Sequence, residues 1–190
     1  RIARRRQLPL VFTHHTMYER YTHYVPFESD AMKRLAIEIA KSYANLCSHV
    51  IAPSESVARV LRERGVQTAL DVVPTGVNVD RFSQGDRARG RQQMGIDDDT
   101  FVVGYVGRLA YEKNLEYLAE AACQFLTQTE KTVFTAVGEG DAKDEMKAIF
   151  DRHELGDRAF FPGKKTGDAL CDAYAALDVF TFASQTETQG

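Results

Sequence analysis

Two cationic side chains, Arg108 and Lys113, follow an apolar run that ends at Val106 and precede a helical pattern that starts near Asn114. The N-terminus of a helix offers unpaired N–H groups and a partial positive charge, which favour a bound phosphate. Arginine can bind phosphate oxygens in a bidentate manner, and lysine adds a point charge. The segment therefore suits a diphosphate. The alternative is a surface pair of cations with Glu112 as the acidic partner.

The segment Gly138-Glu139-Gly140 follows the next apolar run and opens a further helical pattern. Glycines at such a place let the backbone approach a nucleotide closely. A short G-x-G is weak evidence, because it falls far short of a dinucleotide-binding fingerprint. A tight turn is therefore the alternative interpretation.

A long loop from Thr13 to Tyr24 follows the first apolar run and contains His14, His15 and His23. It is too long for a plain connection and rich in polar and aromatic side chains, which indicates binding. Histidine can hydrogen-bond a sugar hydroxyl or a phosphate near neutral pH, and tyrosines can line an acceptor groove. An exposed or core histidine without a ligand is the alternative. The loop lacks the carboxylate or cysteine spacing of a metal site.

Acidic residues at three further positions bear on the chemistry. Glu187 lies in a polar stretch after an apolar run, where it can hold sugar hydroxyls or begin a helix. Asp97 and Asp99 have the spacing of a metal-binding D-x-D motif, but they precede a strand, and ligands collect after the strands of a parallel sheet. A solvated turn is therefore predicted for this pair, and no metal site is predicted.

The elements that must position these residues alternate between short apolar runs and longer helical patterns. This alternation is typical of βα units that build a parallel sheet, and it predicts the α/β class. Ser54 is predicted to cap the N-terminus of one helix, and Gly65 to end it. Strands are predicted at residues 8–13, 49–52, 70–73, 100–107, 132–137, 159–161 and 179–182, with helices at 30–46, 55–64, 114–126, 142–153 and 168–177.

The segment 84–91 contains almost no large apolar side chain, so it is expected to contribute little to a core and to act as a linker. We therefore predict two parallel-sheet domains, in residues 1–82 and 100–190, joined by a linker at 83–99. Both domains are expected to be incomplete, because the chain opens at a late βα unit and closes directly after a strand.

The overall composition argues against several classes of function. A formal net charge of −3 gives no field that would attract nucleic acid. The three cysteines lack the paired spacing of a zinc or redox motif, which favours free thiols and the cytoplasm. No apolar run approaches the ~18 residues that suggest a membrane-spanning helix. The basic cluster at residues 1–6 is interpreted as the end of a helix, with contact to lipid headgroups as the alternative.

Taken in order, six motifs resemble glycosyltransferase family four, a family of retaining glycosyltransferases with the two-domain GT-B fold. The resemblance spans nearly the whole chain. The motifs are T-H-H-T-M-Y-E at 13–19, P-T-G-V-N-V-D-R-F at 74–82, G-R-L with E-K-N at 107–114, G-E-G at 138–140, F-P-G at 161–163 and S-Q-T-E-T-Q-G at 184–190.

The resemblance implies roles for individual residues. Arg108 and Lys113 would hold the donor diphosphate and stabilise the leaving nucleotide diphosphate, so that neither a metal nor another cofactor is required. His15 would lie beside the donor sugar. Glu187 would be the first of two glutamates separated by seven residues and would contact the donor hexose. The residues implied to line the nucleotide site are Gly107, Gly138, Glu139 and Gly140.

The implied function is retaining transfer of a hexose from a nucleotide-sugar, predicted to be UDP-glucose, to an acceptor. The segment H-T-M-Y-E-x-Y-T-H-Y at 15–24 resembles transferases that glycosylate diacylglycerol-type lipids, which implies a peripheral enzyme at the inner face of the plasma membrane. Lys33, Arg34 and Lys41 on the helix from Asp30 can meet an anionic surface or simply be solvated. The chain lacks the second glutamate and the glycine-rich loop of the first domain, so we do not expect it to catalyse transfer alone.

Two other classes of function remain open. A nucleotide-binding α/β protein, such as a sugar epimerase or an oxidoreductase, would need a complete G-x-G-x-x-G after a strand, and no segment completes it. A catalytically silent nucleotide-sugar-binding module would keep the same cations, and nucleotide binding without turnover would identify it.

Overall fold

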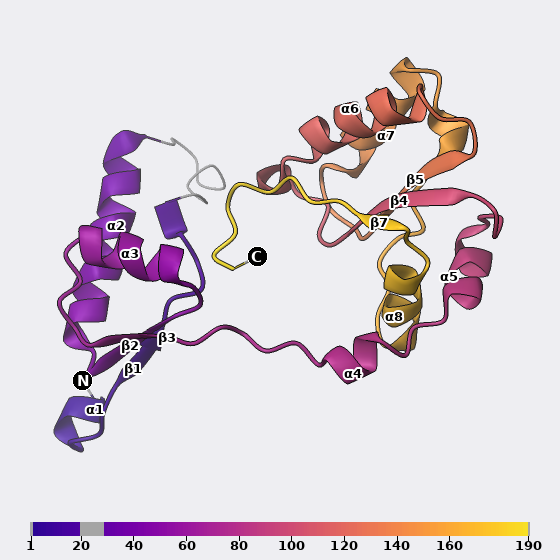
Figure 1. The fold of residues 1–190 in the computed structure, drawn as a ribbon. Helices are drawn as coiled ribbons and strands as arrows, with labels where there is room; N and C mark the ends of the chain where they lie inside the picture. The colour runs from indigo at the N-terminus through magenta and orange to yellow at the C-terminus, as the bar shows by residue number, and fades with distance from the viewer. Residues whose placement is uncertain (1, 20–28, 190) are drawn as a thin grey trace. The chain divides into compact units, whose positions relative to one another are not determined.

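The computed structural model describes residues 2–19 and 29–189, which fall into two compact units. The first unit comprises Arg1–Gly76 with Thr186–Gly190, and the second unit comprises Val77–Gln185. Strands and helices alternate along the chain in both units (Figure 1). The α/β class predicted from the alternation of apolar runs is confirmed.

The first unit is built on a three-stranded parallel sheet in the order β1-β2-β3. The helices α2 and α3 connect the strands and share one apolar core with them, which includes Ala44 of α2 and Leu61 of α3. Figure 1 shows both helices on the same side of the sheet, as right-handed crossovers in one direction require. The elements are α1 (Ile2–Arg5), β1 (Val11–Thr13), α2 (Asp30–Leu46), β2 (His49–Ala52), α3 (Glu55–Glu63) and β3 (Leu70–Val72).

The ends of α3 follow the predicted capping residues. The Ser54 side chain accepts a hydrogen bond from the N–H of Val57 at 3.4 Å, which satisfies one of the free donors of the first turn. Gly65 follows the C-cap residue and has a φ of +87°, a conformation that costs glycine little. Both predictions are confirmed.

The second unit contains a four-stranded parallel sheet in the order β6-β5-β4-β7. The chain moves from β4 through β5 to β6 in one direction and then places β7 on the other side of β4. Ligands of such sheets bind outside the carboxyl ends of the strands near this reversal. The elements are α4 (Val79–Phe82), α5 (Arg87–Met94), β4 (Phe101–Val106), α6 (Leu115–Leu126), β5 (Thr132–Val137), α7 (Lys143–Arg152), β6 (Ala159–Phe160), α8 (Asp168–Ala175) and β7 (Val179–Phe180), with short 3-10 helices at Tyr111–Lys113 and Gly156–Arg158.

Helices cover both faces of this sheet. One face packs on α6 and α7, in a core where the rings of Phe134 and Phe150 stack with centroids 5.1 Å apart. The other face packs on α5 and α8, through Met94 and Ala176 among others. This three-layer arrangement is the Rossmann-like organisation expected from the sequence.

The segment 84–91 differs from its expectation, because it contains most of α5 and that helix packs on α8. A Cβ at Gly90 would lie 2.2 Å from the carbonyl oxygen of Asp172, so the bare glycine lets the two helices approach closely. Arg91 is completely buried and donates to Asp178 at 2.8 Å. The expectation of little core contribution is wrong, because the burial is achieved with glycine and paired charge instead of large apolar side chains.

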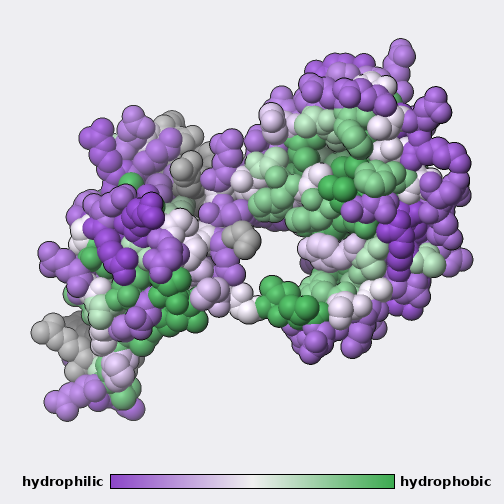
Figure 2. Space-filling model, in the orientation of Figure 1, coloured by the Kyte–Doolittle hydropathy of each residue, from purple (hydrophilic) through white to green (hydrophobic). Residues whose placement is uncertain are grey.

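Hydrophilic side chains cover much of the visible surface, and hydrophobic surface remains over β7 and α6 (Figure 2). Large exposed apolar side chains of these elements are Phe125, Val179 and Phe180. In the part of the chain that the structure describes, none of the helices combines the length and apolar character needed to cross a bilayer.

Candidate functional site

The turns after β4 and β5 lie side by side, because these two strands pair in register up to Val106 and Val137. The N–H of Gly107 donates to the carbonyl of Val137 at 3.0 Å, and the N–H of Leu109 donates to that of Glu139 at 2.9 Å. Two segments that the sequence singled out separately therefore meet at the carboxyl edge of one sheet.

Glycine is required at two places in this pair of turns. A Cβ at Gly138 would lie 1.8 Å from the carbonyl oxygen of Gly107, and a Cβ at Gly140 would lie 2.1 Å from that of Leu109. Gly140 also has a φ of +152°. The G-E-G segment is thus a tight turn whose backbone lies in contact with the neighbouring turn. Because its two glycines have no side chain, a ligand can also approach the backbone closely.

Arg108 forms an ion pair with Glu112, four residues later in the chain. The Arg108 side chain is 56% exposed, whereas that of Glu112 is only 1% exposed. The phenol of Tyr105 donates to the carbonyl of Arg108 at 3.2 Å and thereby stabilises the turn. The acidic partner considered from the sequence is therefore present, and it anchors a guanidinium that still faces solvent.

Lys113 ends the 3-10 helix Tyr111–Lys113 and is half-buried. The next residue, Asn114, adopts the left-handed conformation with φ 55° and donates from its amide to the carbonyl of Ala183 at 3.3 Å. Helix α6 then begins at Leu115. The predicted order of strand, cationic turn and helix N-terminus is present.

A cavity of about 470 Å³ opens beside these turns. Its basic lining residues are Arg108, Lys164 and Lys165, and of the residues that the structure describes Glu139 is the one acidic member of the lining. Glu139 pairs with Lys143 at 3.2 Å, which leaves the cationic side chains in excess around the cavity. The remaining lining residues are Val106, Gly107, Val137, Gly138, Leu170 and Tyr174.

Four lining residues were missed by the sequence analysis: Lys164, Lys165, Leu170 and Tyr174. The two lysines directly follow the F-P-G motif after β6, so their position after a strand was a usable signal. Leu170 and Tyr174 lie on α8, where a helical apolar pattern gives no hint of a ligand. Burial raises the pKa of Tyr174, so its phenol stays neutral at physiological pH.

The structure brings together four of the predicted site residues in this cavity, namely Gly107, Arg108, Gly138 and Glu139, with Gly140 in the adjoining turn. Lys113 lies in the same connection but does not line the cavity.

His15 and Glu187 are both exposed and belong to the first unit. Within that unit, the hydroxyl of Thr188 donates to the carbonyl of His15 at 2.9 Å, which places the residue after Glu187 beside His15. The Ser54 hydroxyl donates in turn to the carbonyl of Thr188 at 2.7 Å. The part of the histidine-rich loop at residues 20–24 lies outside the described residues.

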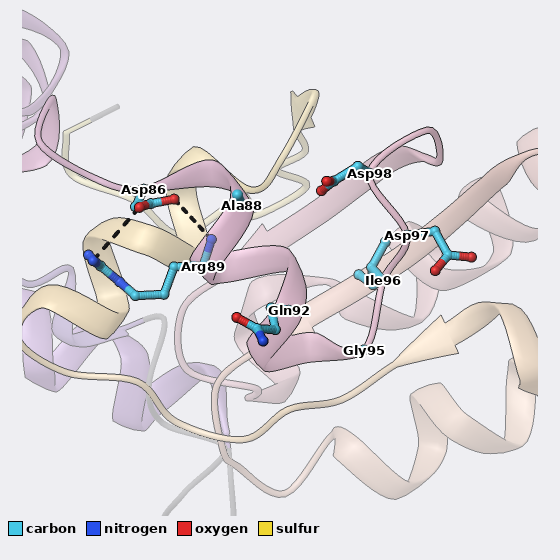
Figure 3. Close-up of a pocket in the computed structure, with 8 residues that line it drawn as sticks. All are labelled: Asp86, Ala88, Arg89, Gln92, Gly95, Ile96, Asp97 and Asp98. Carbon is cyan, nitrogen blue, oxygen red and sulfur yellow. Dashed lines mark hydrogen bonds and ion pairs between the residues drawn. The ribbon is translucent and has the colours of Figure 1, made fainter.

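A larger cavity, of about 770 Å³, lies between α5 and the 95–98 turn (Figure 3). Its ionisable lining consists of Asp86, Asp97, Asp98 and Arg89, and Asp86 pairs with Arg89. An excess of carboxylates would repel a phosphate. Among the described residues, no group of three or more His, Cys, Asp or Glu side chains could hold a metal ion.

The remaining member of the D-x-D pair, Asp99, pairs with Lys131. Both side chains are largely exposed, and this ion pair lowers the pKa of Asp99. The solvated turn predicted for these residues is confirmed.

Two family models match the chain. The model described as Glycosyltransferase Family 4 matches residues 1–81, and the model described as Glycosyl transferases group 1 matches residues 86–190. The second match alone covers more than half of the chain, and together the two leave only a short stretch unmatched.

Two curated relatives align with the whole chain. The alpha-monoglucosyldiacylglycerol synthase of Streptococcus pneumoniae is 28% identical over 194 residues, which cover 100% of this chain and 44% of the relative. The enzyme of the same name from Acholeplasma laidlawii is 29% identical, over 100% of this chain and 50% of its own length. The chain thus spans about half the length of these relatives.

Solved structures show the fold. Anabaena HepE in complex with UDP and glucose superposes with a TM-score of 0.78 at 23% identity, over 96% of this chain and 48% of that one. Sucrose-phosphate synthase from Thermosynechococcus elongatus gives a TM-score of 0.77 at 24% identity, over 98% and 48%. The GT-B type expected from the sequence, with parallel sheets in both units, is confirmed.

Proposed function

The chain belongs to the Glycosyl transferases group 1 family, and we propose that it is the part of a retaining glycosyltransferase that binds a nucleotide-sugar donor. In the proposed reaction a hexose passes from the donor to an acceptor hydroxyl. The donor diphosphate binds in the cavity lined by Arg108, Lys164 and Lys165. The dinucleotide-binding alternative is not favoured, because the family matches point to glycosyltransferases.

One observation carries the proposal: a cation-rich cavity lies at the carboxyl edge of the second sheet, where two glycine turns expose their backbones. A diphosphate needs positive charge and close backbone approach, and both are present here. The apolar surfaces of Leu170 and Tyr174 suit the nucleoside, because a base can pack on an aromatic or aliphatic side chain.

The chemistry needed from these residues is electrostatic. The bond between the anomeric carbon and the diphosphate oxygen breaks while the acceptor oxygen forms a bond on the same face of the sugar. The acceptor proton passes to the leaving diphosphate. Cationic side chains that are fixed before the reaction stabilise the charge that develops on the leaving group. We propose that Arg108 supplies this stabilisation, with Lys113 nearby in the same connection, and that no divalent metal or other cofactor is required.

We propose His15 and Glu187 as the residues that contact the donor hexose. The support is the resemblance of their motifs and the hydrogen bond that places Thr188 beside His15. An imidazole and a carboxylate can both hydrogen-bond sugar hydroxyls.

The donor and acceptor are proposed from the relatives. Both relatives that align with the whole chain are named alpha-monoglucosyldiacylglycerol synthase, which supports a glucose donor and a diacylglycerol-type acceptor. UDP is the nucleotide bound in the structure of HepE. We therefore propose UDP-glucose as donor and a membrane lipid as acceptor.

We propose a cytoplasmic enzyme that is peripheral at the inner face of the plasma membrane. Helix α2 supports this location, because it exposes Leu35, Ile39 and Leu46, which are 60%, 61% and 77% exposed. These apolar residues recur with helical spacing, and the basic residues Arg34 and Lys41 lie on the same helix. Such a helix can bind an anionic interface.

Calorimetric titration of UDP and of UDP-glucose into this chain tests the proposal, with and without EDTA. We expect binding that EDTA does not change and that Arg108→Ala weakens at least about tenfold, the loss of one charge-assisted contact. Arg152→Ala is the matched control, because Arg152 is an exposed arginine of the same unit that pairs with Glu120. Equal binding by the Arg108 and Arg152 variants, or binding abolished by EDTA, would contradict the proposal.

A further inference from the structure

Arg64, the C-cap residue of α3, contacts the loop that follows β1 at two points. Its guanidinium forms an ion pair with Glu19, and its Nη1 lies 3.9 Å from the sulfur of Met17. The side chains of Arg64 and Glu19 are only 23% and 12% exposed. A hydrogen-bonded ion pair that is largely removed from water holds its geometry more firmly than a surface pair.

These contacts fasten the loop where the sheet no longer holds it. The N–H of His14 donates to the carbonyl of Ile51 at 2.9 Å and continues the pairing of β1 with β2. Further along, Met17 packs against the core of the first unit, and Glu19 reaches Arg64. One side chain at the C-terminal end of α3 therefore contacts two residues of the loop.

The loop places two adjacent histidines in opposite environments. His14 is 1% exposed and lies edge-on to the rings of Phe12 and Tyr18, with centroids 5.6 and 5.9 Å away. Neither ring nitrogen of His14 has a hydrogen-bond partner among the described residues. His15, in contrast, is exposed. An imidazole that is buried with no hydrogen-bond partner among the described residues is costly to enclose, so the contacts around it help to hold it in place.

We propose that Arg64 is a positioning residue for His15: through Glu19 and Met17 it fixes the loop so that His14 stays enclosed and His15 is presented to the ligand. This inference rests on the proposed function in one respect, the role of His15 beside the donor sugar. The two-point contact uses the fork of the guanidinium, so a lysine would keep the charge but reproduce the geometry only in part.

The pKa of the His14 imidazole can report on whether Arg64 holds the loop in place. Burial lowers the pKa of His14, and of the nearby charges Glu19 raises this pKa while Arg64 and His15 lower it. Loss of Arg64 would remove one cation and would let water reach the ring. Both effects favour the protonated imidazole and would raise the pKa of His14.

Histidine side-chain NMR on the whole 190-residue chain tests the inference. Resonances are assigned with His14→Gln and His15→Gln. We expect Arg64→Gln to raise the titration midpoint of His14 by about half a unit or more, and Arg64→Lys to reverse part of this change. Arg62→Gln is the matched control, an exposed arginine of the same helix end, and should leave the midpoint unchanged. An unchanged His14 midpoint in folded Arg64→Gln, or an equal shift in Arg62→Gln, would overturn the inference.

Addition of UDP-glucose to the same samples tests the role of His15 separately from the positioning of the loop by Arg64. The His15 resonances of the unmodified chain should move on addition of UDP-glucose, and those of Arg64→Gln should move less. No movement in the unmodified chain would contradict the proposed role of His15. The titration midpoint of His14 is measured without ligand, so it tests the positioning by Arg64 whether or not His15 contacts the donor sugar.

Discussion

The carboxylate of Glu112 is almost completely buried, yet its ion-pair partner Arg108 has a side chain that is 56% exposed. One end of the pair is thus fixed inside the protein, and the other faces the cavity. A guanidinium held in this way loses less freedom when it binds a phosphate, because its position is set beforehand. Substitutions of these two residues can therefore separate the effect on UDP binding from the effect on the stability of the protein.

Arg108→Ala should therefore have two effects. It should weaken UDP binding, and it should lower the free energy of unfolding by about 1–3 kcal/mol, because the buried carboxylate of Glu112 loses the hydrogen bond from Arg108. The double variant Arg108→Ala/Glu112→Gln should recover most of the stability but none of the binding. Urea unfolding and calorimetry on the same samples measure both. Recovery of UDP affinity in the double variant would show that Arg108 does not contact the ligand.

The lysines after β6 should contribute to affinity through charge. Lys164→Ala and Lys165→Ala are each expected to weaken UDP binding by about two- to fivefold, as partly solvated cations do. The loss should shrink in high salt, because screening already weakens these interactions. Lys131→Ala, at an exposed lysine that pairs with Asp99, provides the control. A salt-independent effect, or an effect equal to the control, would rule out a charge contact.

Gly138→Ala should disrupt the paired turns. The new methyl group would meet the carbonyl oxygen of Gly107 at 1.8 Å, so the backbone must shift, at a cost of about 1–3 kcal/mol. Gly76→Ala is the matched control, because a Cβ there meets nothing within 4 Å. Thermal unfolding compares the two variants, and equal midpoints would contradict the close approach of the turns.

The docking of α5 on α8 should depend on pH in the acid range. The hydrogen bond from Arg89 lowers the pKa of Asp172 below its unfolded value. A carboxyl with a lowered folded pKa contributes stability above its unfolded pKa of about 3.9, and the contribution disappears as the pH falls through the folded pKa. Asp172→Asn should therefore destabilise the protein at pH 7 and flatten its loss of stability below about pH 4. The exposed Asp144→Asn is the control in urea unfolding, and identical pH profiles for the two variants would contradict the account.

The exposed apolar face of α2 should bind anionic membranes. The double variant Leu35→Glu/Ile39→Glu places two carboxylates on this face, and it should reduce co-sedimentation with vesicles of anionic phospholipid at least about tenfold. Phe125→Glu, on the exposed surface of α6, should not. Equal sedimentation of both variants would exclude α2 as the contact surface.

Much of this fold is readable from the sequence because its strands and helices are marked by local signals. The helix at 30–46 and the strand at 132–137 have the predicted bounds, since apolar periodicity sets them directly. Helix α5 was not predicted, because its buried residues are Gly90 and Arg91 as well as Met94. Glycine and arginine resemble linker residues until their partners, Asp172 on α8 and Asp178 just before β7, are known.

Some residues of the candidate site could likewise be predicted from the sequence, and others could not. Arg108 and the G-E-G segment were found because they follow strands of a parallel sheet, and pairing of β4 with β5 brings them together. The buried state of Glu112 and the cavity contact of Tyr174 depend on tertiary packing and leave no local pattern. Arg64 and Glu19 are 45 positions apart, so their ion pair was equally invisible in the sequence.

Backbone NMR during a UDP titration can show whether the donor nucleotide binds in the cavity beside the β4 and β5 turns. We expect the largest amide shifts at Gly107, Gly138 and Gly140 and at Lys164 and Lys165, with smaller or absent shifts around Asp86, Asp97 and Asp98. The two sets belong to different cavities of the same unit, with Gly140 in the turn that adjoins the first cavity, so the comparison is internal to one sample. Shifts concentrated in the second set, or none at the three glycines under saturating UDP, would contradict the account.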